Sequence, residues 1–170
     1  ILPEEVENNI VVPWFDMDAM QEAYDACGGD VAGLIAQPYD HGNFFDNVCA
    51  TKEQWAKVRK FCDDHGMVLI IDDVRTGFRL DIAGSDHYYG FKADLICFCK
   101  ALANGYNMSC VCGQEHMKNT ASSVVYTGSY WMSAEPFAAC LACIPKMKKL
   151  DTPKMFREMG TKLTDGFKAA

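Results

Sequence analysis

Short apolar runs that stop at a charged residue or a turn recur along the chain, and amphipathic segments separate them. Runs of five or six apolar residues bounded by turn signals are typical of strands buried on both faces, as in parallel sheets. The pattern predicts strands over residues 8–13, 31–37, 67–72, 94–99 and 108–113, and helices over residues 16–27, 51–65, 136–149 and from 152 onward. This alternation predicts a single α/β domain with right-handed crossovers between parallel strands.

Local signals mark the ends of several elements. Asp16 is a good N-cap for the first long helix, and Gly28 and Gly29 close it. Thr51 and Gln54 have the spacing of a capping box. Between the long elements, we expect an irregular loop over 38–50, a short helix or turn within 80–93, and a short helical piece followed by a weak strand over 123–126.

Two strands end in a polar residue followed by a glycine-containing turn. Asp72 ends the run 67–72, and Lys100 follows the run 94–99. In parallel sheets, ligands bind beyond the carboxyl ends of the strands, so we expect Asp72 and Lys100 at one polar site. From the spacing alone, a surface salt bridge or charges at a helix start are equally good explanations.

Composition narrows the function classes. The 170 residues carry a formal net charge of −7, which argues against nucleic-acid binding as the main activity. No apolar run approaches the roughly 18–20 residues needed to cross a bilayer. The nine cysteines are odd in number and sit in apolar segments, which indicates a reducing compartment, so we expect a cytoplasmic protein. The opening residues lack both an initiator Met and the pattern of a secretory signal, so we expect a processed or partial chain.

The pair formed by Asp72 and Lys100 has a definite chemical use. A lysine with a lowered pKa can form a Schiff base with an aldehyde. A carboxylate at the neighbouring strand end can keep the ring nitrogen of a pyridine aldehyde protonated, and that ring then stabilises a carbanion at an amino acid's Cα. The released lysine can move a proton as general base.

Five segments resemble the class III pyridoxal-phosphate-dependent aminotransferases, especially glutamate-1-semialdehyde aminomutase and its relatives. Residues 67–79 (MVLIIDDVRTGFR) are similar to the family's D-E-V-x-T-G-F-R strand, and residues 100–106 (KALANGY) to the segment with the Schiff-base lysine. Residues 128–131 (GSYW) resemble the G-T-F-W turn, and residues 10–13 and 35–38 resemble the V-V-V-P and V-x-E-P strands. The segments occur in the family's order, with 28 residues from the aspartate to the lysine.

The resemblance implies a three-layer α-β-α, mostly parallel fold-type-I domain and a set of site residues. Lys100 would form the Schiff base with pyridoxal 5'-phosphate (PLP), Asp72 would pair with the ring nitrogen, and Val74 would pack on the ring. Ser129 stands where the family has a threonine that binds the cofactor phosphate of the partner subunit. The resemblance therefore implies a homodimer with its active site at the interface.

The chain also departs from the family pattern. Asp73 and Gln37 each replace a glutamate and Asn107 replaces a proline, which affects the substrate expectation more than the cofactor. Family members are longer, so we expect residues 1–170 to be the second half of the large PLP-binding domain, without its N-terminal part and the C-terminal small domain. The expected function is an aminotransferase or aminomutase acting on an amino acid or an amino-aldehyde or keto substrate. The alternative is a non-catalytic truncated paralogue that keeps the fold for dimerisation or partner binding.

Cysteines and histidines offer further candidates. The C-x-C pairs at 97–99 and 110–112 could supply four thiolates to zinc, but buried cysteine packing is favoured, and no metal site is expected. His41, in the aromatic loop, could face the active site, although a position away from it is favoured. His65 is expected to bind carbonyls at its helix end, and His87 and His116 are expected at the surface.

Overall fold

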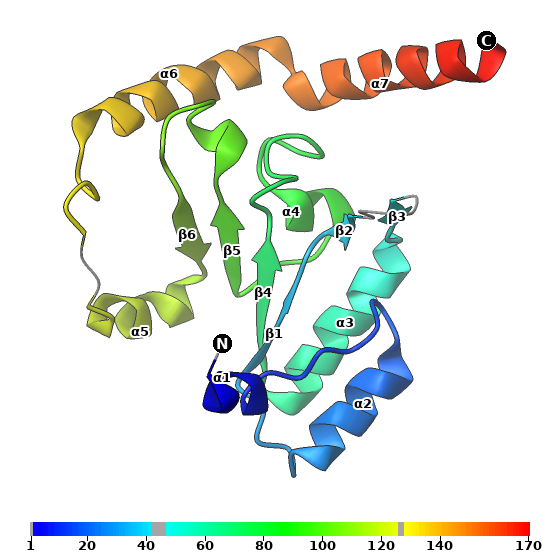
Figure 1. Ribbon diagram of the computed structural model, residues 1–170, viewed down its shortest axis with the longest axis vertical. Helices are drawn as coiled ribbons and strands as arrows, with labels where there is room; N and C mark the ends of the chain where they lie inside the picture. The colour runs from blue at the N-terminus through cyan, green and yellow to red at the C-terminus, as the bar shows by residue number, and fades with distance from the viewer. Residues whose placement is uncertain (1, 42–46, 126–127) are drawn as a thin grey trace.

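A computed structural model of the protein describes residues 2–41, 47–125 and 128–170 (Figure 1). Strands and helices alternate through most of it. The strands are β1 (Gly33–Ala36), β2 (Tyr39–Asp40), β3 (Val48–Cys49), β4 (Val68–Asp72), β5 (Leu95–Phe98) and β6 (Cys110–Gly113). The helices are α1 (Pro3–Glu7), α2 (Met17–Ala26), α3 (Lys52–His65), α4 (Ser85–Tyr89), α5 (Lys118–Ser123), α6 (Ala134–Leu150) and α7 (Thr152–Ala169), with 3-10 turns η1 (Lys100–Leu102) and η2 (Glu115–Met117).

The main sheet has the strand order β1-β4-β5-β6. The pairs β1–β4 and β4–β5 are parallel, whereas β6 runs antiparallel to β5. The segments that connect the parallel strands contain helices: α3 lies between β1 and β4, and α4 lies between β4 and β5 (Figure 1). The predicted α/β class with a mostly parallel sheet is confirmed.

Capping residues fix the starts of α2 and α3 as their sequence predicts. The Asp16 side chain accepts the backbone N–H of Ala19 at 3.0 Å. Thr51 and Gln54 form the reciprocal capping box, with bonds of 2.8 and 3.1 Å. His65 Nδ1 lies 2.8 Å from the carbonyl oxygen of Phe61, which confirms its expected place at the end of α3.

The main core lies between α3 and one face of the sheet. Trp55, Val58 and Cys62 of α3 are buried together with Leu69 and Ile71 of β4. These strand residues alternate with side chains that point to the other face, because successive residues of a strand face opposite ways.

That other face differs from the expectation of strands buried on both sides. Ile35 pairs in register with Ile70, and Val111 with Cys97, so these four side chains share a face. Ile70 and Cys97 are half-buried, and Ile35 and Val111 are 66% and 64% exposed.

Three other predictions are wrong in detail. Residues 8–13 form no strand: Val11 is 95% exposed and has no strand to pair with among the described residues. The loop predicted over 38–50 contains the hairpin of β2 and β3, although residues 42–46 lie outside the description. The weak strand expected over 123–126 is absent as far as residue 125, because Ser123 instead ends α5; residue 126 lies outside the described part.

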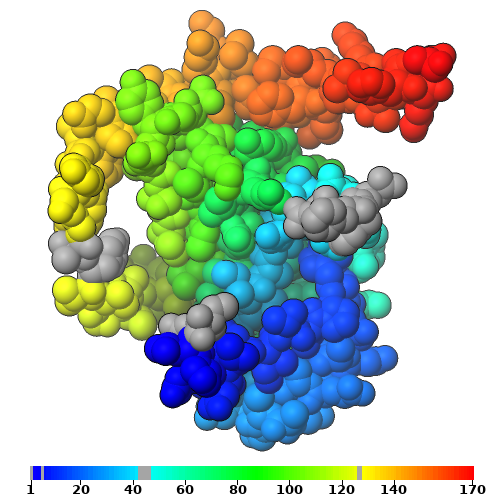
Figure 2. Space-filling model, viewed as in Figure 1, coloured from blue at the N-terminus to red at the C-terminus, as the bar shows by residue number. Residues whose placement is uncertain are grey.

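The two C-terminal helices form a ridge along one side of the molecule (Figure 2), and α7 projects beyond the sheet (Figure 1). Met147 of α6 packs into a second apolar cluster with Phe78, Phe98 and Leu102. In the described ranges, no helix is long and apolar enough to cross a membrane.

Candidate active site

Asp72 and Lys100 lie at the carboxyl ends of adjacent strands. Asp72 is the last residue of β4 and pairs in register with Cys97 of β5. The strand β5 ends one residue later, and Lys100 begins η1. The structure therefore places both residues beyond the carboxyl ends of the strands, where ligands of parallel α/β proteins bind.

The charges of Asp72 and Lys100 do not neutralise each other directly. Both residues are described, and no ion pair or hydrogen bond joins their side chains. Asp72 Oδ1 accepts the N–H of Val74 at 3.1 Å, which orients the carboxylate, while Oδ2 accepts no hydrogen bond from a described residue. The salt-bridge explanation of this pair is wrong, and within residues 2–41, 47–125 and 128–170 one Asp72 oxygen and the amine of the exposed Lys100 have no hydrogen-bond or ion-pair partner.

The turn after Asp72 is fixed by its own backbone. The N–H of Gly77 donates to the Asp73 carbonyl at 2.7 Å, and Arg79 donates through its backbone to Thr76 and through its side chain to the Arg75 carbonyl. A Cβ at Gly77 would lie 2.7 Å from the Phe98 ring and 2.8 Å from a backbone oxygen, so only glycine fits. Val74, the predicted ring-packing residue, sits half-buried in this turn.

Asp73 anchors the turn through hydrogen bonds in the interior of the protein. It is fully buried, and its carboxylate accepts both the N–H and the hydroxyl of Ser85 at the start of α4. Burial raises the pKa of Asp73, and the hydrogen bonds from Ser85 oppose that rise. This departure from the family's glutamate thus has a structural use, because the carboxylate ties α4 to the loop that carries Val74.

Replacing Asp73 by alanine should destabilise the protein strongly. The change leaves the buried N–H and hydroxyl of Ser85 without their charged acceptor, at a cost of about 3 kcal/mol. Urea denaturation of the full-length protein measures this loss of unfolding free energy. The matched control is Asp64→Ala, because Asp64 forms an exposed pair with Lys60 and should cost less than about 1 kcal/mol. Equal losses in the two variants would contradict a supporting role for Asp73.

Lys100 is held by its backbone. Its φ of +43° lies in the left-handed region, which non-glycine residues seldom adopt. The N–H of Asn104 donates to the Lys100 carbonyl at 3.0 Å. Leu102, in the same 3-10 turn, is buried in the second apolar cluster. A rigid apolar base therefore presents an exposed lysine side chain.

Ser129 is not brought to this site within the chain. It lies exposed in the turn before α6, and the segment that leads into α6 runs on the far side of β6 from β4 (Figure 1). Its expected role concerns the partner subunit's cofactor, which requires a surface position, and that role stays a prediction.

His41 follows β2, shortly after the carboxyl end of β1, and β1 runs parallel to β4, which ends at Asp72. The charges of Arg75, Asp72 and Lys100 act on its imidazole. The position of His41 depends on the β2–β3 hairpin, which no local signal in the sequence predicts.

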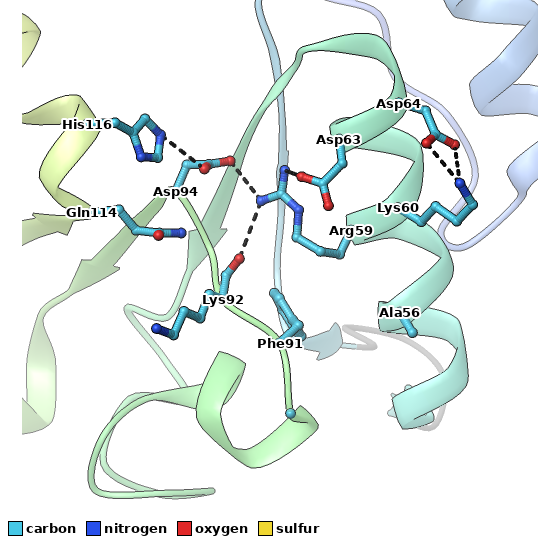
Figure 3. Close-up of a pocket in the computed structure, with 11 residues that line it drawn as sticks. Ala56, Arg59, Lys60, Asp63, Asp64, Phe91, Lys92, Asp94, Gln114 and His116 are labelled. Atoms are coloured by element: carbon cyan, nitrogen blue, oxygen red, sulfur yellow. Dashed lines mark hydrogen bonds and ion pairs between the residues drawn. The ribbon is translucent and has the colours of Figure 1, made fainter.

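A polar pocket lies at the amino end of β5, separate from Asp72 and Lys100. It has a volume of about 720 Å³ and is lined by charged residues of α3 and of the segment entering β5 (Figure 3). Asp94, just before β5, accepts the N–H of Leu69 at 2.8 Å and Arg59 at 2.7 Å, and His116 lies 3.3 Å away. Burial raises the pKa of Asp94, but these hydrogen bonds and charges outweigh burial and hold it below its usual range.

The Asp94 contacts predict a pH-dependent contribution to stability. Asp94→Asn should cost about 1.5–3 kcal/mol at neutral pH, because Arg59 loses a buried charged partner. Because folding lowers the pKa of Asp94, its contribution is complete above the unfolded value of about 3.9 and disappears as the pH falls through the folded pKa. Unfolding free energies of the full-length protein, measured across this acidic range, test the prediction.

The control uses the same arginine. Asp63 also pairs with Arg59, at 2.8 Å, but it is 64% exposed, so Asp63→Asn should change stability by less than about 1 kcal/mol. A loss for Asp94→Asn that stayed constant below pH 3 would contradict this assignment.

Several cysteines pack in the apolar clusters, whereas Cys49 and Cys112 are exposed. In the described part of the chain, which includes all nine, no group of three or more His, Cys, Asp or Glu side chains could hold a metal ion. Cys110, Cys140 and Cys143 lie against the second apolar cluster. Burial, with the neighbouring thiols, raises the pKa of Cys110 to about 12, which disfavours the thiolate that zinc requires. The predicted packing role is therefore supported for these three residues.

Comparison with known proteins agrees with this geometry. The family model "Aminotransferase class-III" matches residues 14–169. The chain is 34% identical to an aminopentol aminotransferase of Sphingopyxis macrogoltabida over 91% of its length, and 33% identical to a glutamate-1-semialdehyde 2,1-aminomutase of Sulfurihydrogenibium azorense over 98%. It spans only 36% and 40% of these two relatives.

Solved structures give the same assignment. The FumI protein of Sphingopyxis sp. MTA144, in its PLP internal aldimine form, superposes with a TM-score of 0.92 at 32% identity, over 99% of this chain and 41% of that one. A PLP-bound transaminase superposes with a TM-score of 0.73 at 25% identity, and the match covers 84% of this chain and 35% of the transaminase chain. These matches confirm the family and the fold that the sequence motifs indicated: the chain belongs to the class III aminotransferases.

Proposed function

We propose that the protein is part of a PLP-dependent aminotransferase or aminomutase, in which Lys100 holds the cofactor covalently and Asp72 binds its ring nitrogen. One observation carries the assignment. Asp72 and Lys100 have opposite charges, lie at adjacent strand ends and do not pair with each other, in a fold that resembles PLP-bound enzymes. The free Asp72 oxygen and the Lys100 amine have the donor and acceptor chemistry that such a cofactor needs.

Each residue has a separate task in this proposal. Asp72, oriented by the Val74 N–H, holds a proton on the ring nitrogen. Val74 supplies an apolar contact for the ring from the rigid turn. PLP bound there supplies an electron sink that stabilises negative charge at the substrate's Cα. The Lys100 amine, when released, moves a proton at that carbon, a role worth about 10²–10⁴ in rate.

The assembly belongs to the same proposal. Ser129 is exposed, and the segment that contains it runs on the far side of β6 from β4 (Figure 1), as expected for a residue that completes a neighbouring subunit's phosphate site. We therefore propose a homodimer with the site at its interface, built on the second half of the large domain. The chain spans about 40% of its relatives, so the full protein would supply the remaining contacts. A cytoplasmic location fits the free thiols of all nine cysteines.

The reaction is tested on the full-length protein loaded with PLP. Glutamate 1-semialdehyde serves as the aminomutase probe, without a second substrate. An amino-polyol, offered with pyruvate as a keto acceptor, serves as the aminotransferase probe. Turnover that requires the acceptor identifies transfer between molecules, and turnover without it identifies the aminomutase reaction. A protein that binds no PLP would instead favour the non-catalytic paralogue.

A further inference from the structure

The hairpin that follows the carboxyl end of β1 is anchored to α3. Trp55 of α3 donates its indole N–H to the carbonyl of Pro38 at 3.2 Å, and Pro38 is itself buried. The next residue, Tyr39, pairs with Cys49 in the hairpin. His41 follows directly after this strand, so its backbone is held on the folded core at one side.

The His41 side chain contacts Tyr39 and leaves one ring nitrogen without a partner among the described residues. Its ring lies 4.1 Å from the ring of Tyr39, between centroids. The Nε2 atom is buried, yet no described residue forms a hydrogen bond with it. A buried ring nitrogen without a partner is unusual in a folded protein and indicates a site for a polar ligand atom.

Charged groups surround the ring. Burial is the main cause that lowers the pKa of His41, and Arg75 and Lys100 lower it further, whereas Asp72 and Asp40 raise it. The lowered pKa leaves the imidazole neutral near pH 7, with one nitrogen able to donate and the other to accept.

We propose that His41 is a further cofactor-binding residue of the Asp72–Lys100 site, and that its buried Nε2 forms a hydrogen bond with an oxygen of bound PLP. The inference rests on the proposed function. It adds a residue from the β2–β3 hairpin to a site otherwise built from β4, the following turn and η1. The alternative, in which His41 only stabilises the hairpin through Tyr39, leaves the buried nitrogen without a partner.

The first test follows the histidine signals by NMR in full-length protein labelled with ¹³C-histidine. The His41 signal is assigned by its loss in the variant His41→Gln. On addition of PLP this signal should shift, and its titration midpoint in the free protein should lie below that of an ordinary histidine. The control is His116, which lies beside Asp94 at the amino end of β5 and should keep its signal.

The second test compares two substitutions. His41→Phe keeps an aromatic ring against Tyr39 but removes the hydrogen bond, so it should weaken PLP binding about tenfold. His41→Gln restores a polar group and should recover most of the affinity. A role limited to the hairpin predicts the reverse order, with His41→Phe close to wild type.

The outcomes separate the two proposals. A lysine-dependent visible band with a shifted His41 signal and weakened binding by His41→Phe supports both. The same band with an unmoved His41 signal, or with unchanged binding by His41→Phe, overturns the inference and leaves the proposed function intact. Absence of the band from the wild-type protein overturns the proposed function and, with it, the assignment of His41.

Discussion

Replacing Lys100 by alanine is expected to abolish the visible absorption band that PLP gives when it is bound through a lysine. The same change removes the proton-moving amine, so any residual activity should fall by at least about 10²–10⁴-fold. Alanine is an L-residue like lysine and meets the same left-handed backbone, so the variant removes the amine without altering the conformational requirement of the turn. Absorption spectra and turnover of the full-length protein, before and after PLP is added, measure both effects.

A matched control uses a lysine near the amino end of β5. Lys92 is exposed and lies beside the Asp94 pocket, so Lys92→Ala should keep both the band and the activity (Figure 3). A Lys100→Ala protein that still gave the band would show that another amine holds the cofactor. That result would remove the basis of the functional proposal.

Replacing Asp72 by asparagine should lower the rate by about 10²–10³-fold, the usual effect of deleting one well-placed electrostatic group. Asparagine keeps an oxygen for the Val74 N–H, so the turn should stay folded. It lacks the negative charge that keeps a ring nitrogen protonated, so the loss should appear in kcat rather than in the amount of PLP held by Lys100. Steady-state kinetics and the visible spectrum separate the two quantities.

The Asp72 experiment needs a charge-matched control. Asp64→Asn also removes one carboxylate, but from the outer surface of α3, and should leave kcat unchanged. A wild-type kcat for Asp72→Asn would show that the carboxylate orients the turn only. The ring-nitrogen assignment would then be wrong, while the role of Lys100 could still stand.

Local signals predicted the parts of the fold that local physics decides. The caps at Asp16 and Thr51 and the apolar runs before Asp72 and Lys100 each lie within a few residues of the element they define. The register that sets Asp72 beside Cys97 follows from parallel strands that end on the same side of the sheet, so the placement of Asp72 and Lys100 at neighbouring strand ends could also be foreseen.

Features that depend on distant contacts could not be foreseen in the same way. The apolar residues near Val11 read as a strand, but strand formation needs a neighbour to supply hydrogen bonds. The position of His41 depends on the bond between Trp55 and Pro38, seventeen residues apart, and on a hairpin only two residues deep. The bond from Asp73 to Ser85 likewise joins separate elements, and the sequence identified Asp73 only as a departure from the family.

The left-handed backbone at Lys100 bears on what the sequence can tolerate there. Glycine would adopt that conformation freely, whereas a side-chain-bearing residue costs about 1 kcal/mol or more. Folding alone therefore gives no reason to keep a lysine at this place, and drift without a need for the amine would favour the smallest residue. A descendant that had lost its chemistry would be recognisable by glycine at position 100 in an otherwise intact sheet.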